Sequence, residues 1–232
     1  MIEIIPAILP QTYTDIEKGV ALVHELAPTI QIDFCDGKFV TSKTWWFNGK
    51  DVARKDDILS EKEGLPFWDS INYEFDLMIE DPLSEIDTFI ALGPSKIIFH
   101  LKTVSVEKLL AYFEGLSEVV HQTISFGVAL QSDDDPASIA PLVPYLRRIQ
   151  CMGITHIGAQ GQPFNEAVIP FVAKLHALYG ETVRIGVDGA VSPQNVKALV
   201  DAGARRLVVG SAIFQSIDPH GTIEALQELA NA

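Results

Sequence analysis

The chain has 232 residues, of which 47% are apolar and 21% charged, a composition typical of a globular protein with a sizeable core. Its 17 basic and 31 acidic residues give a net charge of −14. This balance disfavours nucleic acid and anionic membrane surfaces as partners, so any positive potential that attracts an anionic ligand must be local.

Cysteine usage and hydropathy indicate the compartment. Cys35 and Cys151 both lie inside apolar runs, which argues against a disulfide framework and for a reducing environment. No stretch approaches 18 apolar residues, and the start "MIEIIPAILP" lacks the basic flank of a signal peptide. We therefore expect a cytoplasmic protein without a membrane span.

Short β-branched or aromatic runs alternate with helix-period segments eight times along the chain. The strand-like runs begin at Ile2, Thr29, Ile71, Lys96, Thr123, Arg148, Val183 and Arg205. Eight strand and helix pairs at this length predict one α/β domain over residues 1–232, a (β/α)8 TIM barrel. A doubly wound open sheet is the alternative, but no GxGxxG follows the first strand.

Two helix starts carry capping signals. In "TYTDIEKGVALVHEL" a threonine is followed by Asp15, and "SPQNVKALVDAGA" offers Ser192 as N-cap and Pro193 at the first helical position.

One segment interrupts the alternation of strands and helices, because residues 41–70 after the second strand are more than a loop and a helix need. Its Trp45 and Trp46 could cover a ligand, dock a neighbouring subunit or fill a gap on the barrel.

Side chains alternate along a strand, and in a barrel one set faces the interior. In the second strand Gln31, Asp33 and Cys35 form the inward set, opposite three apolar residues. The groups expected near the carboxyl ends of the strands, where barrel active sites lie, are Asp33, Asp76, His100, Lys102 and Asp188. The groups expected lower in the barrel, as structural ion pairs, are Glu3, Glu74, Arg184 and Arg206.

Three converging carboxylates are costly, because burial and like charges each raise the pKa of a carboxyl group. The compensation must be a bound cation, a shared proton or an ammonium such as that of Lys102. Inward carboxylates at a barrel mouth are poor structural choices and suit acid and base catalysis.

Glycine-bearing turns follow the late strands, at residues 153–162, 187–195 and 208–214. In barrels the loops after strands seven and eight commonly hold phosphate through backbone N–H groups. The sequence therefore predicts a phosphate site that needs little basic charge.

With these motifs in view, the chain resembles the ribulose-phosphate 3-epimerase family along nearly its whole length. The matching pieces, in family order, include "IIPAIL", "IDFCDGKFV", "DLMIEDP", "IIFHLKT", "VDGAVSPQN" and "GARRLVVGSAIF". The resemblance implies a (β/α)8 barrel that inverts C3 of a ketopentose 5-phosphate, with two aspartates exchanging protons on opposite faces of the substrate.

Carried over by position, the resemblance implies Asp33 and Asp188 as the acid and base pair. It implies Cys35, Met78 and Met152 as the residues that line the enediolate. The residues implied to bind the substrate phosphate, or to close over it, are Gly158, Ala159, Gln160, Gly161, Gly189, Ala190, Gly210 and Ser211.

The metal site departs from the family pattern. The family's two metal-binding histidines are replaced by Gln31 and Asp76, so the implied set of Asp33, Asp76, Asp188 and Gln31 is all oxygen. Such a set favours Mg²⁺ or Mn²⁺ over Zn²⁺, with a metal-free site as the alternative.

The leading hypothesis is an isomerase of the racemase and epimerase class acting on a small phosphorylated sugar, with a homo-oligomer left open. One alternative is a lyase or aldolase that uses Lys102 as a Schiff-base or carbonyl-polarising group. The other is a non-catalytic paralogue that binds a sugar phosphate without turnover. His100 is expected to be a hydrogen-bonded barrel residue and His156 an exposed loop residue.

Overall fold

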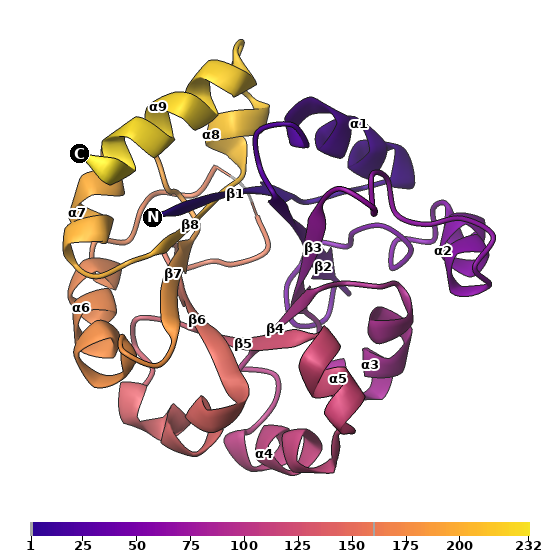
Figure 1. Cartoon of the computed structure of the whole chain (residues 1–232), viewed down its shortest axis with the longest axis horizontal. Coiled ribbons are helices and arrows are strands. Elements are labelled where there is room, and N and C mark those ends of the chain that lie inside the picture. Colours follow the sequence, from indigo (N-terminus) through magenta and orange to yellow (C-terminus); the bar gives the residue numbers. More distant parts are fainter. Residues whose placement is uncertain (1, 160) are drawn as a thin grey trace.

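A computed structural model describes residues 2–159 and 161–232 of the chain. Its eight parallel strands pair in sequence order and close into a barrel, which confirms the predicted fold (Figure 1). The strands are β1 (Glu3–Ile8), β2 (Thr29–Cys35), β3 (Asn72–Met78), β4 (Lys96–His100), β5 (Ser125–Leu130), β6 (Leu146–Met152), β7 (Arg184–Asp188) and β8 (Arg206–Val209).

Helices surround the barrel on its outside (Figure 1). They are α1 (Tyr13–Val23), α2 (Val52–Leu59), α3 (Pro82–Ala91), α4 (Val106–Gly115), α5 (Glu118–Thr123), the 3-10 helix η1 (Pro136–Tyr145), α6 (Val168–Tyr179), α7 (Val196–Asp201), α8 (Ser211–Phe214) and α9 (Pro219–Asn231). In the described residues no helix combines the length and the apolar character that a membrane crossing requires.

The main core lies between the strands and the helices. Ile32 and Phe34 of β2 are fully buried there, whereas the neighbouring Gln31 and Asp33 form hydrogen bonds inside the barrel. The alternation along β2 therefore delivers polar side chains to the interior without disturbing the apolar layer outside.

The capping signals have different outcomes at the two helices. At α1, Thr12 and Asp15 form a reciprocal capping box, as the sequence predicted. At α7 the prediction was wrong, because the helix begins at Val196 with Asn195 as its N-cap. The Asn195 side chain accepts a hydrogen bond from the backbone N–H of Ser192 at 2.9 Å. That bond closes a turn over the residues predicted as the first helical ones.

The long segment after β2 packs on the outside of the barrel. Trp45 is fully buried, and its ring centroid lies 5.1 Å from that of Tyr13 and 4.9 Å from that of Trp46. The ring centroid of Trp46 lies 4.8 Å from that of Phe34 and 5.4 Å from that of Phe89. Of the three roles considered for this tryptophan pair, filling a gap on the barrel is the one these contacts describe.

Ion pairs link Glu3, Glu74, Arg184 and Arg206 at the lower end of the barrel, as predicted. Glu74 and Arg206 are buried in the interior, whereas Arg184 is mostly exposed. Arg206 Nη2 donates to Glu74 Oε2 at 2.6 Å, and its Nε lies 3.2 Å from Glu3 Oε2. Arg184 also pairs with Glu3. Arg148, which was not predicted, joins these ion pairs 3.5 Å from Glu74.

Candidate active site

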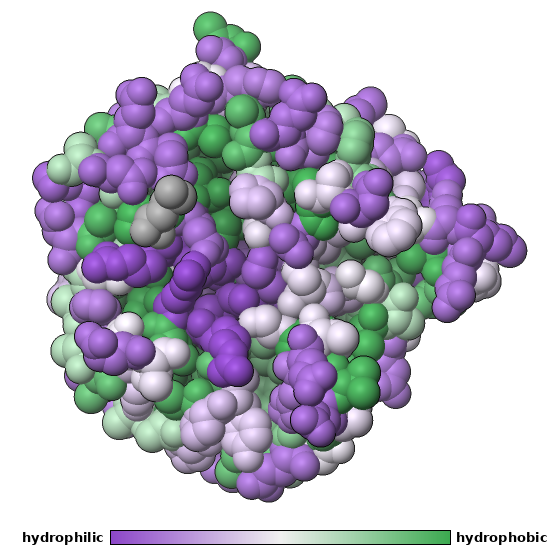
Figure 2. Space-filling model, viewed as in Figure 1, coloured by the Kyte–Doolittle hydropathy of each residue, from purple (hydrophilic) through white to green (hydrophobic). Residues whose placement is uncertain are grey.

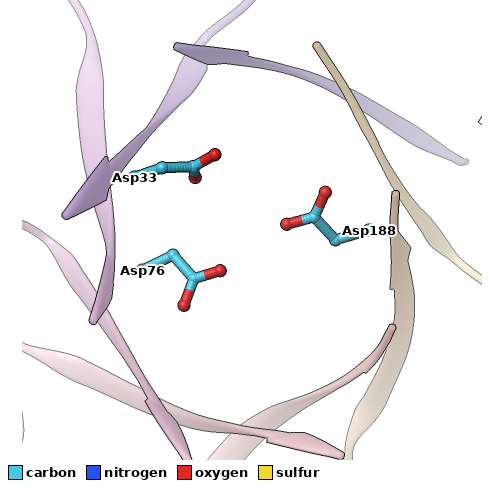
Figure 3. Close-up of side chains that lie close together, drawn as sticks. All are labelled: Asp33, Asp76 and Asp188. Atoms are coloured by element: carbon cyan, nitrogen blue, oxygen red, sulfur yellow. The ribbon is translucent and has the colours of Figure 1, made fainter. Parts of the chain in front are cut away.

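Three aspartates meet at the carboxyl end of the barrel. Asp33 of β2 and Asp76 of β3 are register partners on adjacent strands, and Asp188 ends β7 on the other side. Their carboxylates point toward one another inside the ring of strands (Figure 3). Each residue offers an oxygen, and these oxygens all lie within 4.8 Å of one another. The arrangement places Asp33 and Asp188 across a common space in which a small substrate can sit.

Two glutamine amides bridge the carboxylates. Gln31 Nε2 donates to Asp33 Oδ1 at 2.8 Å and to Asp188 Oδ2 at 2.9 Å. Gln150 Nε2 donates to Asp188 Oδ2 at 3.1 Å and to Asp76 Oδ2 at 3.0 Å. The two amides thus fix the relative positions of all three acids through four hydrogen bonds.

Sequence reasoning missed Gln150. The signal was present, because Arg148, Gln150 and Met152 alternate along β6 as the inward residues do in β2 and β3. Gln150 therefore takes the inward position in β6 that Gln31 takes in β2.

His100 supports the triad from β4. Its Nε2 donates to Asp76 Oδ1 at 2.7 Å, and both side chains are buried. Asp76 therefore has both oxygens engaged, by His100 and Gln150, and is held in one orientation. The expectation of a hydrogen-bonded barrel histidine agrees with this contact.

The electrostatic environment raises the pKa of two of the aspartates. Burial, followed by the negative charge of Asp76, raises the pKa of Asp188 to about 7. Burial, followed by the charges of Asp188 and Asp76, raises the pKa of Asp33 well above its usual value. The Gln31 hydrogen bond opposes both shifts. Near neutral pH the pair can therefore hold one proton between two carboxyl groups, as an acid and base pair requires.

The donor set fits a hard divalent cation. The three carboxylates supply oxygen ligands. The side-chain oxygen of Gln31, predicted as a fourth ligand, is buried without a hydrogen-bond partner, but the amide nitrogen is the atom that faces Asp33 and Asp188. Oxygen donors suit Mg²⁺ and Mn²⁺ better than Zn²⁺. A cation here would also offset the clustering of negative charge that raises the pKa values.

The glycine turns converge on the same place. A cavity of about 60 Å³ is lined by Asp33 and Asp188 and, beside them, by seven of the eight residues predicted for phosphate: Gly158, Ala159, Gly161, Gly189, Ala190, Gly210 and Ser211. The eighth, Gln160, lies outside the described residues. Backbone N–H groups of such turns can bind a phosphate without lysine or arginine.

Backbone conformation explains one glycine here. Gly189 has a φ of +105°, and a Cβ at this position would lie 2.8 Å from Ile154 Cγ1. Only glycine fits both constraints without strain. The turn after β7 can therefore bring its backbone directly up to the cavity.

The three residues predicted to line the enediolate divide into two groups. Met78 and Met152 line the cavity beside the aspartates. Cys35 is fully buried in a cluster with Met78 and Val40 and is not among the lining residues. Burial raises the pKa of its thiol, and both cysteines are free.

Lys102 does not reach the triad, and the prediction that it points inward was wrong. Strand β4 ends at His100, so the alternation no longer applies two residues later. Lys102 Nζ instead lies 2.5 Å from Asp134 Oδ1 and 3.5 Å from Asp133 Oδ1. The Asp134 hydrogen bond raises the pKa of Lys102, which keeps the amine protonated and unsuited to Schiff-base formation. His156 is exposed, as expected.

Comparisons with known proteins agree with this geometry. Residues 3–214 match the model of the ribulose-phosphate 3 epimerase family. The ribulose-phosphate 3-epimerase of Schizosaccharomyces pombe is 27% identical over 97% of this chain and 92% of its own. That of Treponema pallidum is 25% identical over 95% and 93%.

A solved structure supports the fold alone. KGPDC from Streptococcus mutans superposes with a TM-score of 0.71 at 11% identity, covering 100% of this chain and 98% of its own. The family match over residues 3–214 and the two curated relatives identify the protein as an isomerase that belongs to the ribulose-phosphate 3-epimerase family.

Proposed function

We propose that the protein epimerises a phosphorylated ketopentose, with ribulose 5-phosphate as the first candidate substrate. The observation that carries the proposal is the pair of carboxylates, Asp33 and Asp188, that face each other across the space next to the glycine turns. Relatives at 25–27% identity carry the name ribulose-phosphate 3-epimerase. The class of reaction follows from the family, and the substrate and residue roles are the proposal.

The reaction requires one base and one acid on opposite faces of a carbon. The ionised aspartate removes the proton from C3, next to the C2 carbonyl, and the C–H electron pair forms the C2–C3 double bond of an enediolate. The second, protonated aspartate then returns a proton to the other face of C3 as the carbonyl re-forms. Because burial raises the pKa of both carboxyls, one proton can be held by the pair near neutral pH.

The surrounding residues position this pair. Gln31 and Gln150 donate to the carboxylates, which restricts the aspartates to the orientations that face the substrate carbon. Met78 and Met152 provide apolar surface beside them, which limits water and strengthens electrostatic interactions. The phosphate binds to the turns around Gly189 and Gly210 and fixes the distance of C3 from the acids.

A hard divalent cation fits the same carboxylates, and Asp33, Asp76 and Asp188 would hold it. When bound, it supplies positive charge that stabilises the negative charge developing on the substrate oxygens. We expect Mg²⁺ or Mn²⁺ in preference to Zn²⁺. Metal analysis of protein purified without chelator tests this part alone, because a metal-free and active preparation would contradict it.

Isotope exchange tests the proposed reaction. Incubation with ribulose 5-phosphate in deuterated water, with Mg²⁺, Mn²⁺ or Zn²⁺, should place deuterium at C3, as followed by NMR. Asp33→Asn and Asp188→Asn should each abolish epimerisation, because one face of C3 loses its proton-transfer group, whereas Asp201→Asn on the surface of α7 should leave epimerisation unchanged. Tight binding of the sugar phosphate without exchange under any condition would favour the non-catalytic paralogue and refute the epimerase.

We place the protein in the cytoplasm on the basis of its two buried, free cysteines. Fractionation of the source cells, followed by detection with an antibody, tests this location.

A further inference from the structure

The opposite end of the barrel carries an unusual concentration of positive charge. Lys96, Arg148, Arg184 and Arg206 lie at or near the first residues of β4, β6, β7 and β8. They gather at the amino-terminal mouth, with Glu3 and Glu74 between them. Figure 2 shows hydrophilic side chains collected over the centre of this face. In a chain with a net charge of −14, this is a local reversal of sign.

The cations outnumber the carboxylates that neutralise them. Glu74 pairs with Arg206 and Arg148, and Glu3 pairs with Arg206 and Arg184, so two carboxylates serve three guanidinium groups. Lys96 Nζ donates to the hydroxyl of Thr29 at 2.7 Å, and it forms no salt bridge with any residue that the structure describes. Four cations against two carboxylates leave two positive charges without a counter-ion. The cavity they line also includes Arg147 and Glu181, whose opposite charges leave this excess unchanged.

Partial burial makes this excess costly. Arg206 and Arg148 are 2% and 6% exposed. Burial, followed by the charge of Arg206, lowers the pKa of Arg148 to about 10. Burial is the largest cause that lowers the pKa of Lys96 to about 8, although Glu74 opposes it. An anion placed among these groups would remove both penalties.

The same residues line a large open cavity. Its volume is about 1420 Å³, and its wall includes all four cations together with Thr29 and Ser125. This volume is larger than that of a typical small-molecule pocket, so the cavity has room for a small anion. Guanidinium groups are planar donors that match phosphate oxygens two at a time. The net negative charge of the whole protein argues against a long polyanion such as nucleic acid.

We propose that the amino-terminal mouth of the barrel binds a small multivalent phosphate anion, at a site separate from the carboxyl-end cavity. The ligand class is a polyphosphate or phosphate ester with at least two negative charges, equal to the charge excess of the cluster. Arg184 and Lys96 are its principal contacts, because they have the fewest protein partners. The proposal is independent of the epimerase reaction.

Competitive acetylation of the lysines locates the site directly. The protein is labelled with trace acetic anhydride in pyrophosphate, inorganic phosphate or citrate, or in potassium chloride of equal ionic strength, and each lysine is quantified by mass spectrometry. Pyrophosphate should lower the labelling of Lys96 severalfold, and inorganic phosphate should do so less. Labelling of Lys197, on the surface of α7, should not change. Equal protection by chloride, equal protection by citrate, or no protection of Lys96 would overturn the proposal.

Paired variants give a second, independent measurement. Arg184→Gln and Lys197→Gln each remove one cation with a single ion pair, and the two side chains have similar exposure, 62% and 66%. Calorimetric titration should show pyrophosphate binding about tenfold weaker in Arg184→Gln, or about 1.4 kcal/mol, and unchanged in Lys197→Gln. Arg184 is mostly exposed, so this variant should fold even where Lys96→Gln does not. Equal affinity in both variants would refute the site.

Discussion

Replacing Asp188 by asparagine should stabilise the protein while it removes proton transfer. The change deletes one of three clustered carboxylates but preserves the shape of the side chain. The amide oxygen of the new residue can still accept the hydrogen bonds that Gln31 and Gln150 donate to Asp188 Oδ2. The variant therefore isolates the cost of ionising a carboxyl at this position.

The magnitude follows from the raised pKa. Burial and Asp76 raise the pKa of Asp188 from 3.8 to about 7 in the folded state, a shift of about 3 units. At about 1.36 kcal/mol per unit, ionised Asp188 costs the folded state up to about 4 kcal/mol above pH 7. At pH values below the pKa of the unfolded state, the carboxyl is protonated in both states and its raised pKa does not destabilise the fold. The penalty therefore grows as pH rises from about 4 to about 7.

Denaturant unfolding at several pH values, in the presence of a chelator, measures this effect. At pH 8 the free energy of unfolding of Asp188→Asn should exceed that of the wild type by about 2–4 kcal/mol. Near pH 4 the two free energies should be equal. Asp201→Asn, an exposed control, should differ by less than about 0.5 kcal/mol at every pH. A variant no more stable than the wild type at pH 8, or a gain that persists at pH 4, would refute the electrostatic account of the triad.

Three further substitutions test other parts of the molecule. Gln31→Leu removes the hydrogen bonds that hold down the pKa of Asp33 and Asp188, so the acidic limb of the kcat/KM profile should move to higher pH; an unmoved profile would contradict this role. Trp45→Ala empties a fully buried site and should cost about 3–5 kcal/mol in urea unfolding, with KM unchanged if the tryptophan is structural. Gly189→Ala must place a Cβ 2.8 Å from Ile154 Cγ1 at a φ of +105°, so calorimetry should show phosphate binding at the carboxyl-end cavity at least about tenfold weaker. Undiminished binding would separate this turn from the phosphate.

The sequence predicted the barrel and the meeting of the three aspartates because both follow from period-two alternation. Inward residues of successive parallel strands share an interior, so Asp33, Asp76 and Asp188 had to converge once the barrel closed. The same rule was sufficient for Gln150. The alternation rule failed for Lys102 because this residue lies beyond the end of β4. The end of a strand depends on its hydrogen bonds to the neighbouring strand, and side chains beyond that end no longer alternate.

Other features depend on contacts between distant segments, which a single sequence does not display. The hydrogen bond from Gln31 to Asp188 spans 157 positions, and the amide could have pointed elsewhere from the same strand. The start of α7 was misplaced because Asn195 closes a local turn on Ser192, a competitor of the serine cap. The role of Trp45 required knowing which aromatic residues of α1 and β2 lie beneath it.

The narrowness of the carboxyl-end cavity has a consequence for catalysis. At about 60 Å³ it has room for a few water molecules and is well below the size of pockets that enclose metabolites. Ser42 Oγ donates to the carbonyl of Gly158 at 2.5 Å and so ties together the two loops above it. We expect this hydrogen bond to break when the proposed sugar phosphate enters the cavity, and to break again when the product leaves. Solvent viscosity should therefore slow turnover if this opening, rather than the chemistry, limits the rate.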